Sequence, residues 1–144
     1  MSQWHYNWFS NMEPFDEPLV HEGISYLAVE NFYQAQKVKN MDMKLFISEL
    51  DPRKSKTHIR KFNIQPHWTT KEKLAIMEYA LNHKFRLDTS WGRKLLETGD
   101  EEIVEWNNWG DVWWGKDLET KEGLNHLGIL LMKIRNNLKL QQIL

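Results

Sequence analysis

Residues 105–115 contain four of the chain's eight tryptophans, two carboxylates and two glycines. Tryptophan and asparagine offer a flat stacking surface with directional hydrogen-bonding groups, and the carboxylates of Glu105 and Asp111 are candidate bases. Glycine lets a backbone approach a ligand closely. Together these properties would suit a planar base joined to a sugar. One or two tryptophans would ordinarily be buried in a core, but four in one short segment favour the wall of a site.

A second set of reactive side chains is expected on one edge of a helix. The apolar spacing over residues 29–40 predicts an amphipathic helix. Glu30, Gln34 and Lys37 then fall within an arc of about 60° beside the apolar stripe, so that an acid, an amide and an amine share one edge. An exposed Glu and Lys linked through Gln would give the same spacing, and the sequence alone leaves both interpretations open.

Carboxylates, lysines and tryptophans are the side chains that glycosidic hydrolysis needs. One acid protonates the leaving group while a base or nucleophile acts at the oxocarbenium-like carbon. An N-glycosidic bond suits them better than an O-glycosidic one, because its leaving group is a flat heterocycle on which tryptophan can stack. A desolvated lysine could also attack an opened sugar aldehyde to form a Schiff base.

Other kinds of site have no support in the sequence. There is no glycine-rich phosphate loop, no nucleophile elbow and no cysteine, and the six histidines are scattered without the HExxH spacing of zinc ligands. We therefore predict that the chain uses no metal and no cofactor. No stretch approaches the roughly 18 apolar residues that would span a bilayer, and residues 1–5 do not resemble a secretion signal. These observations predict a cytoplasmic chain with no membrane role.

The length of 144 residues predicts one domain covering residues 1–144. The formal net charge of -1 gives no general reason to bind nucleic acid. A local reason exists in a basic run over residues 53–61, although such runs are more often solvated helix faces. A nucleic-acid interaction protein that uses this run is accordingly the weakest of three hypotheses, behind an enzyme and a nucleotide-binding module.

The elements predicted from periodicity and capping are mostly helices. Residues 1–28 read as irregular, with a short hairpin or edge strand over residues 21–27 around Gly23. A capping box, Thr69 to Glu72, begins the clearest helix. Gly128 in the last helix would let another backbone come close, and that helix is expected to bury Leu124, Leu127, Leu131, Ile134 and Leu138. The predicted helices span residues 29–40, 43–50, 52–62, 69–88, 91–97 and 123–140, with a short strand or turn over residues 102–105.

Several of these segments together resemble the NADAR family, also called YbiA-like. The main motifs are VENFYQAQK at residues 29–37, LLETGD at 95–100 with IVE at 103–105, Asp111 with WG at 114–115, and GLNHLG at 123–128 with Leu131, Met132 and Arg135. Ser10-Asn11, Pro52 with Lys56, Trp68, Met77 and Lys84-Phe85 resemble weaker markers of the family. Their order and spacing agree over nearly the whole chain.

The resemblance implies a compact, single-domain YbiA-like helical fold, mainly α with a few short strands, that cleaves N-glycosidic bonds without a metal. Two substrate classes are known in the family: ADP-ribose attached to guanine, and ribosylaminopyrimidine phosphates of riboflavin biosynthesis. The implied partner is a small nucleotide substrate or an ADP-ribosylated nucleic acid. A module that binds ADP-ribose without cleaving it is the alternative, and the oligomeric state is left open.

The family's functional positions carry over onto matching residues of this chain. The resemblance implies acid–base chemistry for Glu30, amine or anchoring chemistry for Lys37, a role at the ribose for Asp111, and a second acid in Glu105. Substrate contacts are implied for Ser10, Asn11, Gln34, Lys56, Trp68, Lys84, Trp114, Gly115, Asn125 and Arg135. Trp109 departs from the commoner family pattern and is a candidate substrate contact as part of the tryptophan segment. Arg135 could equally pair with a buried carboxylate.

Overall fold

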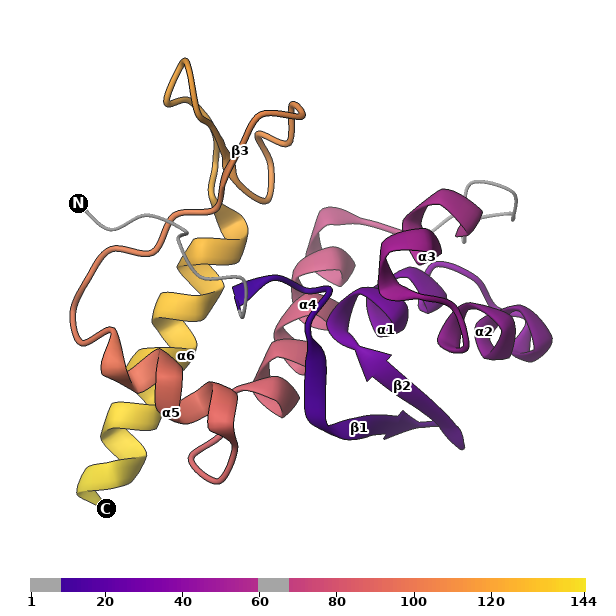
Figure 1. Cartoon of the computed structure of the whole chain (residues 1–144), viewed down its shortest axis with the longest axis horizontal. Helices are drawn as coiled ribbons and strands as arrows, with labels where there is room; N and C mark the ends of the chain where they lie inside the picture. Colours follow the sequence, from indigo (N-terminus) through magenta and orange to yellow (C-terminus); the bar gives the residue numbers. More distant parts are fainter. Residues whose placement is uncertain (1–8, 60–67) are drawn as a thin grey trace. The chain divides into compact units, whose positions relative to one another are not determined.

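A computed structural model describes residues 9–59 and 68–144 of the chain. Helices dominate and the strands are few and short, which confirms the predicted fold class (Figure 1). The chain divides into two compact units, which are described separately below. One is Ser10–Lys84, and the other is Phe85–Leu144 together with Phe9.

The first unit begins with a β-hairpin where the sequence predicts mostly irregular chain. Strands β1 (Pro14–His21) and β2 (Ile24–Ala28) pair antiparallel and are joined by Glu22 and Gly23, both with positive φ. Two such residues make the tight turn whose twist matches a hairpin. The register shifts within β1, next to its second proline. The two prolines argue against a strand in the sequence, because proline has no backbone N–H to donate to a regular sheet ladder. An edge strand with a bulge tolerates proline.

Helix α1 (Val29–Ala35) follows the hairpin directly and is shorter than the predicted helix over residues 29–40. All seven of its residues are buried, so it is enclosed rather than amphipathic. The carbonyl of its last residue accepts from the Val38 amide and from a side chain of the next helix. The Lys44 ammonium donates to the carbonyl oxygen of Ala35 and to Oε1 of Gln36, which closes the end of α1 and redirects the chain.

Three further helices complete this unit, and α1 packs against each of them. They are α2 (Met41–Ser48), α3 (Pro52–Ile59) and α4 (Thr70–Lys84). The predicted end of α3 at residue 62, with Arg60 and Lys61 of the basic run, lies outside the described residues, as does the N-terminal segment 1–5. At the start of α4 the amide of Glu72 donates to Oγ1 of Thr69, as the capping box predicts.

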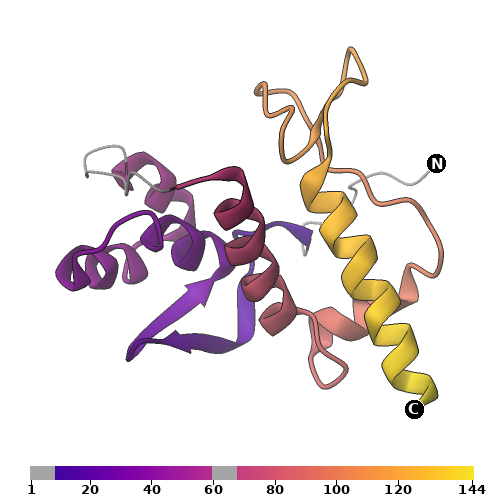
Figure 2. The same cartoon turned by 180° about the vertical axis from the view of Figure 1, so that it is seen from behind.

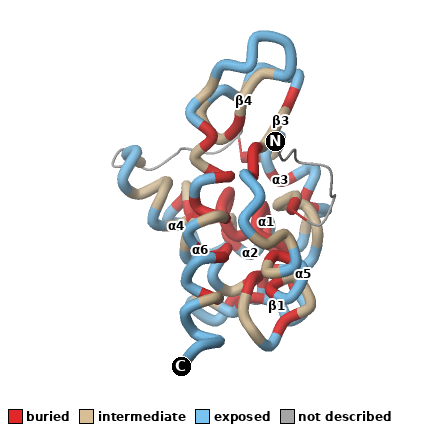
Figure 3. The backbone as a smooth tube through the Cα atoms, turned by 90° about the vertical axis from the view of Figure 1, so that its left-hand side faces the viewer, coloured by how far each residue is buried: buried red, intermediate tan, exposed pale blue. Residues whose placement is uncertain are grey.

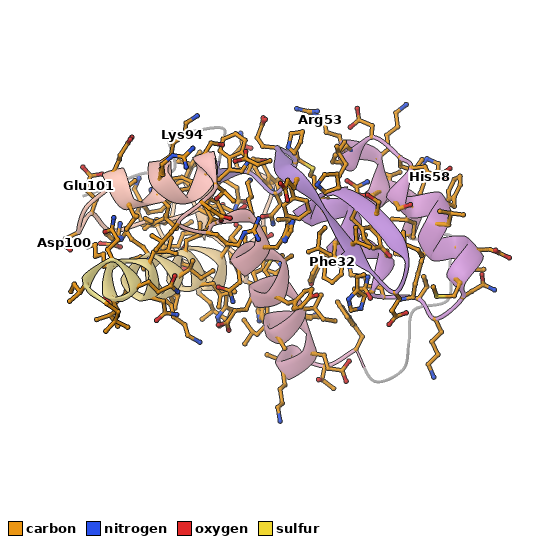
Figure 4. All side chains as sticks on the ribbon, turned by 90° about the horizontal axis from the view of Figure 1, so that it is seen from below. Phe32, Arg53, His58, Lys94, Asp100 and Glu101 are labelled. Carbon is orange, nitrogen blue, oxygen red and sulfur yellow. The ribbon has the colours of Figure 1, made fainter. Side chains whose placement is uncertain are left out.

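Phe32 of α1 is the centre of the aromatic core of this unit (Figure 4). Its ring lies 5.3 Å from that of Tyr26, 5.4 Å from that of His21 and 5.6 Å from that of Tyr79. These partners come from β2, the end of β1 and α4. Aromatic packing therefore fixes α1 between the hairpin and α4.

The second unit is organised around two helices, α5 (Ser90–Glu97) and α6 (His126–Ile143) (Figure 2). The predicted start of α6 at residue 123 is wrong by three residues, because Asn125 has a left-handed φ of 54°. Leu124 consequently lies outside the helix and is 56% exposed, not buried as predicted. The other four members of the predicted stripe are buried.

Gly128 of α6 is the point of close approach that the sequence predicts. A Cβ atom built there would lie 2.2 Å from the carbonyl oxygen of Ile103. The segment over residues 102–105 is neither strand nor turn, which corrects the prediction. Ile103 and Val104 are instead buried in irregular chain. The backbone of this segment bonds to the Asn125 side chain at the α6 N-terminus, and the carbonyl oxygen of Glu105 accepts from the amide of Lys116.

Between these helices the chain makes an excursion with a minimal sheet. Strand β3 (Trp106–Asn107) pairs in parallel with β4 (Lys116–Asp117). The tips of the excursion are exposed and its base, where it joins α6, is buried (Figure 3). The tryptophan segment of the sequence lies in this excursion, and none of its four tryptophans is buried.

Candidate active site

The Glu30 carboxylate is at the centre of the polar residues of the first unit. Glu30 is only 7% exposed, and its Oε1 accepts a hydrogen bond of 2.6 Å from Nε2 of Gln34 one turn along α1. Gln34 is 2% exposed, and its own Oε1 has no hydrogen-bond partner within the described residues. A buried acceptor without a partner is costly. The pair thus combines a fixed carboxylate with an acceptor that a ligand hydroxyl or amino group can satisfy.

Residues 10–13 lie over the start of α1 and hold Ser10 and Asn11 near Glu30. The carbonyl oxygen of Asn11 accepts from the amide of Glu30 at 3.1 Å, and its side-chain amide donates to Sδ of Met77 at 3.7 Å. Oδ1 of Asn11 is buried and has no partner within the described residues. The predicted Ser10-Asn11 marker is therefore in contact with the first residues of α1.

Lys84, at the end of α4, is a buried residue that anchors residues 10–13. Its side chain is 1% exposed, and the ammonium donates to the carbonyl oxygen of Ser10 at 2.8 Å. Burial, partly offset by the nearby Glu13 carboxylate, lowers the pKa of Lys84 to about 7. The position of Lys84 suits a buried anchor of residues 10–13, because its ammonium is enclosed and already holds a backbone oxygen.

Lys37 differs from Lys84 because it is half-buried and reachable. Its ammonium lies 5.1 Å from the ring centroid of Tyr33, whose ring in turn meets that of Trp68 at 5.5 Å. Burial lowers the pKa of Lys37 to about 8, and Lys56 and Lys73 lower it further against the opposing effect of Glu30. At pH 7 about a tenth of such amines are neutral, which makes Lys37 a usable nucleophile.

Lys73 is a functional candidate that the sequence reasoning did not find. It lies in the first turn of α4, and its charge acts on Lys37 together with that of Lys56 from α3. Tyr33 belongs to the apolar spacing that predicts a helix over residues 29–40, and its ring contacts both Lys37 and Trp68. The capping box places Lys73 on α4, but only the packing of α4 on α1 brings it near Lys37.

The carboxylate of Asp111 in the second unit organises its own loop. Its Oδ1 accepts from the backbone amides of Trp113 and Trp114, the latter at 2.9 Å. Asn107, which is buried, fixes the other side of the same loop. Its Nδ2 donates to the carbonyl oxygen of Asp111, and its Oδ1 accepts from the amides of Trp109 and Asp111. The loop is thus held by side chains that bond to its backbone.

The tryptophans of this loop lie in two different environments. The ring centroid of Trp113 lies 4.5 Å from that of Trp114, edge-to-face, and 4.3 Å from that of His126. The Trp113 ring therefore packs against both of the others. Trp109 is 67% exposed at the tip. The structure therefore joins the backbone of Trp114 to the Asp111 carboxylate and leaves Trp109 exposed, while their roles toward a substrate stay predictions.

Gly115 and Asn125 connect this loop to the base of the excursion. A Cβ atom at Gly115 would lie 2.3 Å from the carbonyl oxygen of Glu105, so the glycine is required by chain packing. Asn125 accepts from the amide of Glu105 with Oδ1 and donates to the carbonyl oxygen of Ile103 with Nδ2, both at 3.0 Å. Both ends of the Asn125 amide are consequently occupied by backbone partners.

Arg135 lies with α5 and not with the tryptophan loop. Its guanidinium donates to Oγ1 of Thr98 at 2.8 Å, and Asp100 and Glu101 raise its pKa against the stronger lowering by burial. The neighbouring Lys139 also binds Asp100. The bond to Thr98 joins the end of α5 to α6. Asp100 and Glu101 are exposed, so the pairing of Arg135 with a buried carboxylate stays a prediction.

The predicted site residues thus form two groups, one in each unit. Residues 9–59 and 68–144 contain no cluster of three or more acidic or histidine side chains that could hold a metal ion. Within the same residues no helix is long and apolar enough to cross a bilayer. The first group comprises Ser10, Asn11, Glu30, Gln34, Lys37, Lys56, Trp68 and Lys84, and the second comprises Glu105, Trp109, Asp111, Trp114, Gly115 and Asn125, with Arg135 apart.

A family profile described as the NADAR domain matches residues 1–139. The chain belongs to the NADAR family. A NADAR relative from Nostoc punctiforme, named as an N-glycosidase, is 35% identical over 141 residues, which covers 93% of this chain and 86% of the relative. The sequence resemblance to NADAR is therefore confirmed.

Two longer relatives carry riboflavin biosynthesis names. One from Vibrio vulnificus is 29% identical over 81% of this NADAR chain, and one from Zea mays is 29% identical over 90% of it. The chain spans only 32% and 23% of their respective lengths. The solved structure of the Escherichia coli protein YbiA matches with a TM-score of 0.81 and 25% identity, over 99% of this chain and 86% of YbiA. The predicted YbiA-like fold is therefore confirmed.

Proposed function

We propose that this NADAR chain hydrolyses the N-glycosidic bond between a ribose and a base. The observation that carries the proposal is a buried carboxylate on α1, Glu30, together with the half-buried amine of Lys37 just beyond the end of that helix, whose pKa is lowered to about 8. An acid and an available amine are the groups that cleavage of a glycosylamine needs. The name of the Nostoc punctiforme relative, N-glycosidase, supports the same reaction class.

In the proposed reaction, Lys37 acts on the sugar and Glu30 acts on the base. Ring opening of the glycosylamine leaves an electrophilic carbon at C1, to which the neutral Lys37 amine adds. The Glu30 carboxylate takes the proton that the added amine releases, and it passes this proton to the base nitrogen as the bond from C1 to that nitrogen breaks. Water hydrolyses the resulting imine, which releases the sugar and restores the amine.

The unpartnered acceptors beside Glu30 support binding of a sugar with free hydroxyls. Oε1 of Gln34 and Oδ1 of Asn11 both lack partners within the described residues. Vicinal hydroxyls of ribose, or an amino group of the base, would supply the missing donors. The substrate is proposed to be either ADP-ribosylated guanine or a ribosylaminopyrimidine phosphate. The riboflavin biosynthesis names of the Vibrio vulnificus and Zea mays relatives support the second class.

Replacing Glu30 with glutamine tests the reaction directly. Glu30→Gln keeps an acceptor for the Gln34 amide and should leave the fold intact, yet it removes the transferable proton. We expect turnover to fall by about 10²- to 10⁴-fold, measured as base and sugar released by chromatography and mass spectrometry. Glu17→Gln, an exposed acid on β1, is the matched control and should retain activity.

Full activity in Glu30→Gln would contradict the role of this carboxylate. If the wild-type chain bound ADP-ribosylated guanine tightly and returned it chemically unchanged after long incubation, the proposed hydrolysis would be wrong. That outcome would support the binding module that does not cleave its ligand.

A further inference from the structure

Lys44 is a buried lysine of α2 that has no part in the reaction proposed above. Its side chain is only 6% exposed, and its ammonium donates to the carbonyl oxygen of Ala35 at 3.4 Å and to Oε1 of Gln36 at 3.2 Å. Both acceptors are neutral oxygens, so they replace only part of the hydration that an ammonium loses on burial. Burial accordingly lowers the pKa of Lys44, against the opposing effect of Glu22.

Backbone hydrogen bonds already close the end of α1 that Lys44 contacts. The carbonyl oxygen of Ala35 also accepts from the amide of Val38 at 3.3 Å. The carbonyl oxygen of Gln34 accepts from the amide of Lys37 at 3.2 Å. Such bonds satisfy the last carbonyls of a helix without any side chain. The Lys44 ammonium therefore adds mainly the bond to the Gln36 side chain, which fixes the residue directly before Lys37.

Lys37 extends from the stretch of backbone that Lys44 holds. The two residues that precede it, Ala35 and Gln36, are the two that the Lys44 ammonium contacts. The Lys37 ammonium lies 5.1 Å from the Tyr33 ring centroid, where its side chain is half-buried. A rotation of the backbone at residue 36 would swing this long side chain away from the ring and into water.

Helix α2 is a fixed support for Lys44. The side-chain amide of Asn31, in α1, donates to the carbonyl oxygens of Ile47 at 3.1 Å and Leu50 at 2.9 Å. At the other end of α2, Oδ1 of Asn40 accepts from a backbone amide of the first turn and caps the helix. The placing of α2 against α1 therefore has support besides the bonds that Lys44 makes.

We propose that Lys44 is a positioning residue which, through its two bonds at the end of α1, holds the Lys37 amine beside the Tyr33 ring. This inference rests on the proposed function, in which Lys37 is the nucleophile. Lys44 is not assigned a contact with the substrate. It acts by keeping the Lys37 side chain half-buried, which lowers the pKa of that amine and limits the directions in which it can approach a sugar.

The environment of the Lys37 amine can be measured without any substrate. Competitive acetylation with acetic anhydride over a range of pH, read by mass spectrometry of peptides, gives the pKa of each reactive lysine. We expect a value of about 8 for Lys37 in the wild-type chain. Lys44→Met and Gln36→Met should both raise it toward the ordinary value of an exposed lysine, because each removes the bond between Lys44 and Gln36. Gln36→Met changes no charge, so its effect cannot come from lost electrostatic repulsion.

Turnover measures the consequence for the reaction, with ADP-ribosylated guanine or a ribosylaminopyrimidine phosphate as substrate. We expect Lys44→Met to lower kcat about ten- to hundredfold and to change KM less than about twofold. A displaced nucleophile slows the chemical step, whereas a damaged binding site raises KM. Combining Lys44→Met with Gln36→Met should lower kcat no further than Lys44→Met alone, since both remove the same bond.

Lys39 provides a matched control in the connection between α1 and α2. It is exposed, so Lys39→Met removes one ammonium and leaves both bonds of Lys44 intact. The pKa of Lys37 should stay near 8 in this variant, and kcat should stay within about twofold of wild type. Urea unfolding checks that each variant is folded. If Lys44→Met does not fold, Gln36→Met alone decides whether the bond positions Lys37.

An unchanged pKa of Lys37 in both Lys44→Met and Gln36→Met would overturn the positioning role. Equal effects in Lys39→Met would also overturn it, because they would show a general effect of charge. So would a rise in KM with kcat unchanged. The proposed hydrolysis fails in a different way, by an absence of bond cleavage in the wild-type chain. The two failures are distinguishable because acetylation of Lys37 needs no substrate.

Discussion

At the scale of single residues, Lys37 and Lys84 are two amines with different environments. Burial lowers the pKa of both, to about 8 for Lys37 and about 7 for Lys84. Lys84 is enclosed and bonded to the carbonyl oxygen of Ser10, whereas Lys37 is half-exposed. A nucleophile must reach its substrate, so accessibility favours Lys37 even though the pKa of Lys84 is lower.

A covalent adduct on Lys37 is the expected consequence. If the wild-type chain is mixed with substrate and sodium borohydride, mass spectrometry of its peptides should find a reduced sugar on Lys37. Lys37→Arg keeps the charge but should lose both the adduct and turnover. An adduct on Lys84, or rapid turnover in Lys37→Arg, would contradict this assignment.

The pKa of the Lys37 amine predicts the pH profile of the reaction. Lys37 acts as the neutral form, so the rate should rise with pH through about 8 and then level off. Glu30 raises the pKa of Lys37, and Lys56 and Lys73 lower it. Lys73→Gln should therefore move the midpoint of the profile to higher pH, because it removes a repelling charge.

At the scale of elements, the N-terminus of α6 depends on one close backbone contact. Replacing a helical glycine with alanine ordinarily stabilises a helix by about 1 kcal/mol. At Gly128 the added Cβ would lie 2.2 Å from the carbonyl oxygen of Ile103 and 2.5 Å from side-chain atoms of Asn125. The clash involves backbone and a side chain held at both ends, so neither neighbour can move cheaply.

We therefore expect Gly128→Ala to destabilise the protein by about 1–3 kcal/mol, measured by urea unfolding. Asn136→Ala, on the exposed face of the same helix, is the control and should be neutral or slightly stabilising. A gain in stability for Gly128→Ala would mean that residues 103–105 do not pack against α6 as described.

At the scale of the whole molecule, the net charge of -1 bears on the choice of substrate. A chain without a strong net charge does not steer a polyanion from a distance. One local concentration of positive charge is the basic run over residues 53–61. Arg53 and His58 of the same basic run lie at the outer surface of α3 (Figure 4).

We expect ADP-ribosylated guanine to be cleaved with kcat/KM values within about threefold, whether it is a nucleotide or part of an oligonucleotide. A parallel assay with a ribosylaminopyrimidine phosphate decides between the two substrate classes. A strong preference for the oligonucleotide that disappears at high salt would contradict this expectation and would favour the basic run as a nucleic-acid surface.

Sequence pattern determined most helices of this protein and the family to which it belongs. Helix starts at capping residues and apolar stripes are local properties, so α4, α5 and most of α6 could be predicted. A hairpin around Gly23 was predicted as well, but the length of β1 and the early end of α1 could not be. They depend on an irregular strand register and on a Lys44 side chain supplied by a different helix. That residues 1–144 form one domain stays a prediction.

The candidate site divides in the same way. Spacing on one helix was enough to pair Glu30 with Gln34, and the motifs were enough to place Asp111 beside Trp114. Only the tertiary structure decided that Glu30 is buried, that Lys73 acts on Lys37, and that the Asn125 amide is occupied by backbone. Burial and electrostatic coupling arise between segments distant in sequence, so they become defined only when the helices pack.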